Sequence, residues 1–186
     1  SSDVCSSDLI KKAAAIANKK EQSMAAEKAD LIVVAIDRLL ALDDAELRKD
    51  FPLVVYQTGS GTQTNMNVNE VVAHMAAKIN AEIEILPNDD VNHGQSSNDI
   101  FPTAMNITAA VAVVRLEEAV QHLIEQLDQK QKQYWNVVKI GRTHLQDATP
   151  LTFGQEISGW KSALEHDLEY LEELNSTLSE LAMEIG

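Results

Sequence analysis

The sequence has few cysteines, glycines, prolines and aromatic residues, and its cysteine content already limits the class of protein. Cys5 is the single cysteine, so the 186 residues can form neither an internal disulfide nor a cysteine-based metal cluster. A lone cysteine suits a reducing compartment, and we expect a cytoplasmic protein. No clustered Cys/His pattern, P-loop or complete dinucleotide-binding glycine motif is present, so we expect no metal and no other cofactor.

Basic residues are scarce as well. Lys and Arg number 15 against 29 Asp and Glu, which gives a formal net charge of −14. A chain this acidic has no field to attract nucleic acid or an anionic membrane surface. No unbroken apolar run approaches the roughly 18 residues of a membrane span, so we expect neither kind of partner. Hydrophobic residues still make up 45%, which is enough for a core and excludes wholesale disorder.

The few glycines and prolines lie between long runs of strong helix formers, which predicts an all-α protein. Apolar residues recur every three or four positions over 157–185, and Thr152 with Gln155 predicts a capping box at the start of this helix. A second long helix is predicted over about 104–134. Neither helix can bury its apolar stripe alone, so both should belong to a bundle completed by other chain segments or subunits.

The runs also predict how the chain is divided. Residues 1–8 repeat a polar triplet without an apolar face, and we expect a disordered or non-native lead there. Residues 9–102 are predicted to form an N-terminal helical domain that carries binding loops. Residues 103–186 are predicted to begin a bundle of long helices that is incomplete in this chain.

Three polar segments, 57–70, 87–99 and 141–150, lie at the joints between helices. Each is dense in hydroxyl and amide side chains and leads into a helix, whose first N–H groups favour anions. Together they could bind a small carboxylate through uncharged donors, whereas any one of them alone reads equally as ordinary caps and turns. His144 stands apart from the other histidines because it lies in such a joint, where it could act as an acid or base.

These segments resemble class II fumarate hydratases of the fumarase/aspartase superfamily. The resemblance runs over about residues 9–186 and is carried by QTGSGTQTNMNVNEV, NDDVNHGQSSNDIFPTAMNI and KIGRTHLQDATPLTFGQEISGW. It implies the helical fold of that superfamily, and a cofactor-free homotetrameric lyase. The implied reaction is the reversible hydration of fumarate to L-malate in the tricarboxylic acid cycle.

The resemblance also implies roles for individual residues. His144 matches the active-site histidine, and Leu86 stands where several relatives have a histidine near a second dicarboxylate site, which weakens that site here. The matching substrate-binding positions are Ser60, Gly61, Thr62, Ser96, Ser97, Asn98 and Thr143, and those of the second site are Asn88 and Asp89.

Family members continue past the position of Gly186 into a loop with the proton-abstracting serine and a lysine. We therefore expect this chain to be a fragment without activity of its own, from a tetramer whose active sites combine segments of different subunits. Two alternatives remain open. One is aspartate ammonia-lyase, which typically has Gln at the position of His144 and Ala near Ser60, or another lyase of the superfamily. A non-catalytic helical assembly protein would have little use for the intact polar segments.

Overall fold

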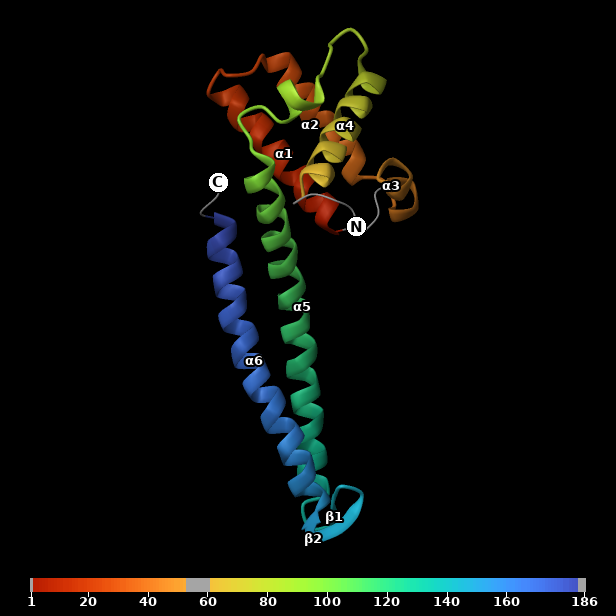
Figure 1. Cartoon of the computed structure of the whole chain (residues 1–186), viewed down its shortest axis with the longest axis vertical. Coiled ribbons are helices and arrows are strands. Elements are labelled where there is room, and N and C mark those ends of the chain that lie inside the picture. Colours follow the sequence, from red (N-terminus) through yellow and green to blue (C-terminus); the bar gives the residue numbers. More distant parts are fainter. Residues whose placement is uncertain (1, 53–60, 184–186) are drawn as a thin grey trace. The chain divides into compact units, whose positions relative to one another are not determined.

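The computed structural model describes residues 2–52 and 61–183 and is built almost wholly from helices (Figure 1). The predicted all-α class is confirmed, apart from one two-stranded ribbon that the sequence did not predict. The elements are α1 (Ser2–Lys20), α2 (Ala26–Leu40), α3 (Asp44–Asp50), α4 (Thr62–Ile79), a π-helical turn η1 (Pro87–Val91), α5 (Ser97–Gln133), β1 (Val138–Thr143), β2 (Gln146–Thr152) and α6 (Phe153–Met183).

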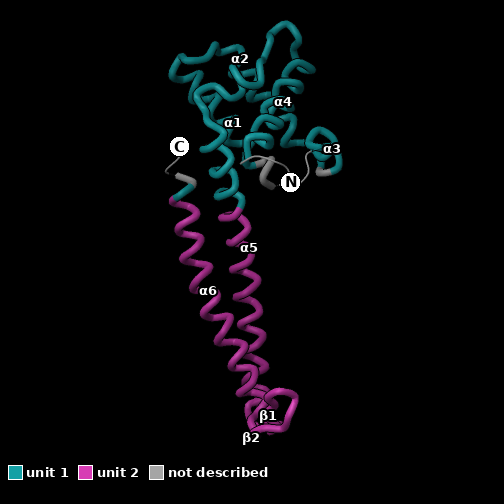
Figure 2. Tube along the Cα trace, in the orientation of Figure 1, with its two compact units in different colours: residues 1–108, 181–186 teal, residues 109–180 magenta. Residues whose placement is uncertain are grey.

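Contacts divide the chain into two compact units (Figure 2). Unit 1 comprises residues 1–108 and 181–186, and unit 2 comprises residues 109–180. The division falls inside α5, the same helix that contains the predicted domain border between 102 and 103. The first two polar segments therefore belong to unit 1, and the third belongs to unit 2.

The core of unit 1 lies between α1, α2 and α4. Its centre includes Ile32, Ile36 and Leu39 of α2 and Val68 and Val72 of α4, all completely buried. Their spacing of three or four residues places each set on one face of its helix. Burial of each such side chain stabilises the fold by roughly 1.5–3 kcal/mol. The segment after α4 is anchored to this core too, through two further buried side chains, Ile85 and Val91.

The start of the chain differs from the expectation. Residues 2–8 are helical rather than disordered, because α1 begins at Ser2 and runs without a break to Lys20, and the other alternative, a non-native lead, stays a prediction. Ser6, Ser7 and Asp8 are buried, and the Thr108 hydroxyl donates a hydrogen bond to Ser6 Oγ over 2.8 Å. These polar residues continue the helix because its buried face packs within unit 1, a tertiary contact that the local composition does not reveal.

Unit 2 contains most of α5, the ribbon and most of α6. The ribbon pairs β1 with β2 in antiparallel register, from Val138 opposite Thr152 to Thr143 opposite Gln146. The register is irregular next to Gly141, where an added Cβ would lie 2.5 Å from the Thr149 carbonyl oxygen. Only glycine permits this close approach of the two strands.

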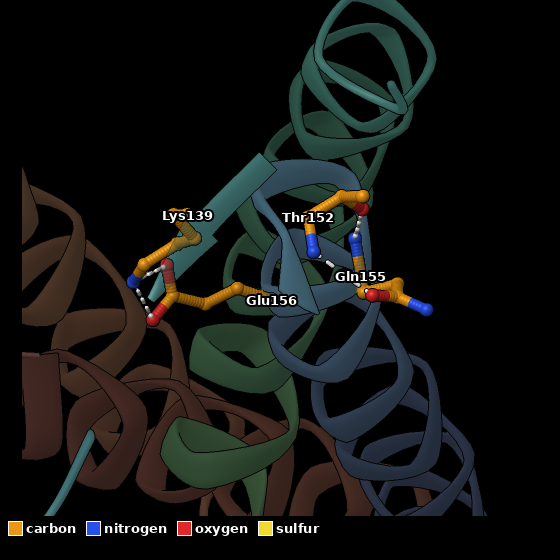
Figure 3. Close-up of polar contacts among 4 residues, drawn as sticks. All are labelled: Lys139, Thr152, Gln155 and Glu156. Atoms are coloured by element: carbon orange, nitrogen blue, oxygen red, sulfur yellow. Dashed lines mark hydrogen bonds and ion pairs between the residues drawn. The ribbon is translucent and has the colours of Figure 1, made fainter. Parts of the chain in front are cut away.

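The capping box predicted at the start of α6 is confirmed (Figure 3). The Gln155 N–H donates to Thr152 Oγ1 over 3.1 Å, and the Thr152 N–H donates to Gln155 Oε1 over 2.9 Å. In the same view Lys139 of β1 forms an ion pair with Glu156 in the first turn of α6, at 2.7 Å. The ribbon is thus fastened to the helix that follows it.

The two long helices of unit 2 leave apolar side chains exposed. Lys161 of α6 forms an ion pair with Asp128 of α5 at 2.8 Å, which ties the two helices together. Hydrogen bonds from Lys132 and Lys161 lower the pKa of Asp128 to about 2. The exposed apolar residues include Val111, Val114, Leu116 and Leu123 of α5, and Trp160, Tyr170 and Leu174 of α6. The predicted need for further partners along these helices therefore stands.

Helix α5 also corrects one argument from the sequence. By length and composition it could cross a membrane, with a mean hydropathy of 1.3 over its most apolar window, although no unbroken apolar run occurs. Its alanine, valine and isoleucine residues keep that window apolar on average, while interspersed threonine and asparagine interrupt the runs. A core helix of a soluble protein passes the same test, so this feature by itself says little about a membrane.

Candidate functional site

The first two polar segments meet at the N-terminal ends of α4 and α5. Thr62 is the first residue of α4 and Ser97 the first of α5. Their hydroxyl oxygens lie 3.3 Å apart, within hydrogen-bond distance. Thr62 is exposed and Ser97 half-buried, so a small molecule can reach both. Two helix N-termini therefore meet beside a pair of hydroxyls, and the positive ends of the two helix dipoles suit an anion.

Gly61 makes the entry into α4 possible. Its φ is +89°, a left-handed conformation that residues with a side chain rarely adopt. A Cβ at this position would lie 2.1 Å from Cδ1 of Phe101, so the backbone passes directly against that ring. The Gly61 carbonyl accepts the N–H of Asn65 over 3.0 Å and starts the helix. The structure thus gives Gly61 a conformational role, and substrate binding by it stays a prediction.

In the segment before α5, one of the predicted ligand-binding hydroxyls, that of Ser96, caps the helix. Ser96 Oγ accepts the N–H of Asn98 over 3.2 Å, the hydrogen bond of an N-cap residue. The Asn98 side chain is exposed. Pro102 lies inside the helix without an N–H group, so the Asn98 carbonyl lacks its usual partner one turn later. The Ser96 oxygen is thus used in capping, whereas the Asn98 side chain is exposed and open to a ligand.

Beneath these residues lies a buried polar network that the sequence analysis did not predict. Asn92 Oδ1 accepts hydrogen bonds from Lys11 Nζ (2.7 Å), Asn65 Nδ2 (3.1 Å) and Asn69 Nδ2 (3.3 Å). Lys11 and Asn69 are completely buried, and burial lowers the pKa of Lys11 to about 8. From the sequence, Lys11 looks like any solvated lysine of an alanine-rich helix. Only its place on the buried face of α1 distinguishes it from its neighbour Lys12.

His144 lies at the tip of the ribbon in unit 2, in an unusual backbone conformation. The turn runs from Thr143 to Gln146, and its two central residues, His144 and Leu145, have φ of +47° and +63°. Such turns usually contain Asn-Gly, because both central residues must be left-handed. Each residue with a side chain costs roughly 1–2 kcal/mol in this conformation. Strain of this kind is concentrated at functional sites, which favours the catalytic role predicted for the exposed His144.

The candidate second site lies on η1. Asn88 and Asp89 are both exposed, and Asn88 Nδ2 donates to Asp89 Oδ1 over 3.3 Å. Asp90 holds the turn together: it accepts the Leu86 N–H over 2.8 Å and forms an ion pair with Lys28. The side chains of Asn88 and Asp89 are therefore not needed to build the turn. Leu86 is 40% exposed beside them and offers no polar group.

None of the residues predicted to be catalytic or substrate-binding lines the pocket of about 310 Å³ beside α3 and α4. That pocket is surrounded by charged side chains, among them Lys49, Glu70 and His74. Within residues 2–52 and 61–183, no group of three or more His, Cys, Asp or Glu side chains is arranged to hold a metal ion. The predicted substrate-binding residue Ser60 lies outside the described residues.

A sequence model of the lyase family matches residues 2–184. The chain belongs to the lyase family. It is 49% identical over 180 residues to the class II fumarate hydratase of Bacillus subtilis, and 51% identical over 175 residues to that of Listeria monocytogenes. Each match covers 94% of this chain. The chain spans only 38% of the length of these curated relatives.

Among solved structures, it is similar to the recombinant class II fumarase of Schistosoma mansoni. The TM-score is 0.82 at 41% identity, covering 95% of this chain and 38% of that one.

In this member of the lyase family, the structure brings together part of the predicted site. Thr62 and Ser97 are in contact, and Asn98 follows directly. Thr143 and His144 belong to the other unit. The signal that could have revealed the buried network is the spacing of Asn65 and Asn69, one helical turn apart on the face that also carries Val68 and Val72.

Proposed function

We propose that this chain is a segment of a class II fumarate hydratase, a hydro-lyase that interconverts fumarate and L-malate in the tricarboxylic acid cycle. The observation that carries the proposal is the contact between Thr62 and Ser97 at the N-termini of α4 and α5. The similarity to the fumarate hydratases named above supports it. Since the chain spans 38% of those relatives, the activity belongs to a longer protein.

The chemistry of the site suits this substrate. Removal of a proton beside a carboxylate of malate builds a second negative charge on that carboxylate. Uncharged donors such as Thr62, Ser97 and Asn98 can stabilise the developing charge, and stabilisation of this kind is usually the largest catalytic contribution. They also bind the dianion without the strong ground-state attraction that a cluster of lysines would exert. Ser60, Ser96 and Thr143 are proposed to complete the donor set.

His144 is proposed to manage the proton of the water molecule that is added or lost. Its left-handed backbone presents the imidazole at the tip of the ribbon, where it is exposed to solvent. A side chain that gives and takes a proton in the transition state typically contributes about 10²–10⁴-fold to the rate. The serine base that acts on carbon is proposed to come from a part of the protein outside this sequence.

We further propose that the full protein is a cytoplasmic homotetramer without a cofactor. The apolar side chains exposed along α5 and α6 in unit 2 are available for the bundle of such an assembly. Each active site would then combine segments of different subunits, as the resemblance to class II fumarate hydratases implies. The exposed pair Asn88 and Asp89 is proposed as a second dicarboxylate site.

The test is an activity assay on the full-length protein, purified from a host that lacks its own fumarate hydratase. Fumarate should disappear in water, as measured by its ultraviolet absorbance, and L-malate should regenerate it. Ammonia and L-aspartate serve as the matched control for the related lyase reaction. Turnover only with ammonia or L-aspartate would identify an aspartate ammonia-lyase. A folded full-length protein that turns over neither pair would contradict an enzymatic function.

A further inference from the structure

Lys11 of α1 is a completely buried cation that contacts Asn92, in the segment between η1 and α5. Its Nζ donates a 2.7 Å hydrogen bond to Asn92 Oδ1, the shortest of the three that this oxygen accepts. Among the described residues, no ion pair joins Lys11 to a carboxylate. Asp8, one helical turn earlier on α1, is buried as well, and neither of its carboxylate oxygens has a hydrogen-bond partner there.

Asn92, which contacts Lys11, also forms a hydrogen bond within the loop that leads into α5. Its Nδ2 donates to the Gln95 carbonyl over 3.0 Å, one residue before Ser96. Gln95 Nε2 in turn donates to the Val91 carbonyl over 3.0 Å, which closes the loop on itself. The same Asn92 is held by Asn65 and Asn69 of α4. One amide therefore links α1, α4 and the segment that carries Ser97.

Fold stability does not explain a lysine at this position. Removing an ammonium from water costs several kcal/mol unless a carboxylate compensates, and an apolar side chain of similar size would fill the same space at lower cost. The lowered pKa of Lys11 reflects that cost. Lys12, the next residue of α1, shows the ordinary alternative: it lies at the surface and forms an ion pair with Asp37.

We propose that Lys11 is a positioning residue: acting through Asn92, it holds the loop before α5 against α4, so that the hydroxyls of Thr62 and Ser97 keep the spacing that binds a dicarboxylate. The identity of the ligand rests on the proposed function. The spacing of the Thr62 and Ser97 hydroxyls does not rest on the proposed function, because it is seen in the structure itself. Misplacement of a binding group by about 1 Å can cost about 10²-fold in rate.

The test compares Lys11→Met with Lys12→Met in the full-length protein. Both substitutions remove a lysine from α1, but Lys12→Met breaks only a surface ion pair. For Lys11→Met we expect kcat to fall by about 10–100-fold, with a smaller change in KM and no fall in melting temperature. Lys12→Met should leave kcat within about twofold. A kcat of Lys11→Met within twofold of the unsubstituted protein would overturn the proposal.

Asn92→Asp provides a second test that does not require Lys11 to be removed. The aspartate keeps an oxygen opposite Lys11 and supplies the missing carboxylate, but it cannot donate to the Gln95 carbonyl. We expect a folded protein with reduced kcat, and wild-type turnover in a folded Asn92→Asp variant would overturn the proposal. If Lys11→Met does not fold, this variant decides the question. Adding Lys11→Met to Asn92→Ala should cost little more than Asn92→Ala alone, because both act through one contact.

Amide hydrogen exchange separates this proposal from the proposed function. In the full-length protein, Lys11→Met should speed exchange at residues 93–98 while Lys12→Met does not. If the unsubstituted full-length protein fails to hydrate fumarate, the proposed function falls, and the exchange result alone decides whether Lys11 positions the loop. Unchanged exchange at 93–98 in Lys11→Met would overturn the positioning role whatever the protein's activity.

Discussion

Replacing His144 with asparagine should remove catalysis without disturbing the turn that presents the side chain. His144 and Leu145 have φ of +47° and +63°, and asparagine is among the residues with a side chain that adopt this conformation most readily. The substitution therefore relieves part of a strain of about 1–2 kcal/mol. We expect the free energy of unfolding of His144→Asn to be unchanged or up to about 1 kcal/mol higher.

Turnover should respond in the opposite direction. Asparagine has a polar group of similar reach but cannot exchange a proton near neutral pH, so kcat in the full-length protein should fall by about 10²–10⁴-fold. The affinity for L-malate should change much less, because the hydroxyl and amide donors of the site remain. Steady-state kinetics in both directions, calorimetric titration with L-malate and thermal unfolding measure the three quantities separately.

Leu145→Asn is the matched control. It introduces the same residue at the adjacent left-handed position, where the leucine side chain is 90% exposed, and it keeps the imidazole. It should stabilise the turn by a similar amount with far less effect on kcat. The reasoning about His144 would be refuted if His144→Asn weakened L-malate binding and left turnover intact, since His144 would then position substrate. Equal losses of kcat in both variants would attribute the effect to the turn rather than the imidazole.

Three further outcomes are expected. Thr62→Ala should lower kcat of the full-length protein by about 10²–10³-fold because it removes a donor from the charged carboxylate, whereas Asn88→Ala should do much less, as steady-state kinetics will show. Burial raises the pKa of Asp8 to about 7, so the folded state binds more protons than the unfolded state above pH 4. Stability should therefore fall by about 4 kcal/mol as pH rises from 4 to 7, and Asp8→Asn should abolish the fall in urea unfolding. The lowered pKa of Lys11, about 8, has the opposite sign: the unfolded state binds more protons between about pH 8 and 10.5, so stability should rise by about 3 kcal/mol across that range, and Lys11→Met should remove the rise.

Local patterns were sufficient where the physical cause is itself local. The capping box at Thr152 and Gln155 depends on two residues three positions apart, and the structure confirms it. The long helices depend on runs without glycine or proline, and both are found. The start of α4 at Thr62 also agrees with the run without glycine or proline that begins there, whereas α5 begins at Ser97 and not at about residue 104 as predicted. His144 was singled out by its polar surroundings in a joint.

Tertiary contacts decided what the patterns could not. Residues 2–8 are helical because unit 1 buries one face of α1, although their composition predicted a disordered lead. The ribbon around His144 depends on pairing between β1 and β2, and its sequence has no alternating apolar pattern to predict it.

Lys11 and Lys12 are chemically identical neighbours, yet one is completely buried and the other lies at the surface. Helix geometry sets adjacent residues about 100° apart around the axis, so only the packing of α1 in unit 1 determines which lysine reaches Asn92. The sequence by itself determined the helices, their caps and the polar joints, since each arises within a few residues. The meeting of Thr62 with Ser97 and the burial of Lys11 required the tertiary structure, because their partners lie 35 and 81 residues away along the chain.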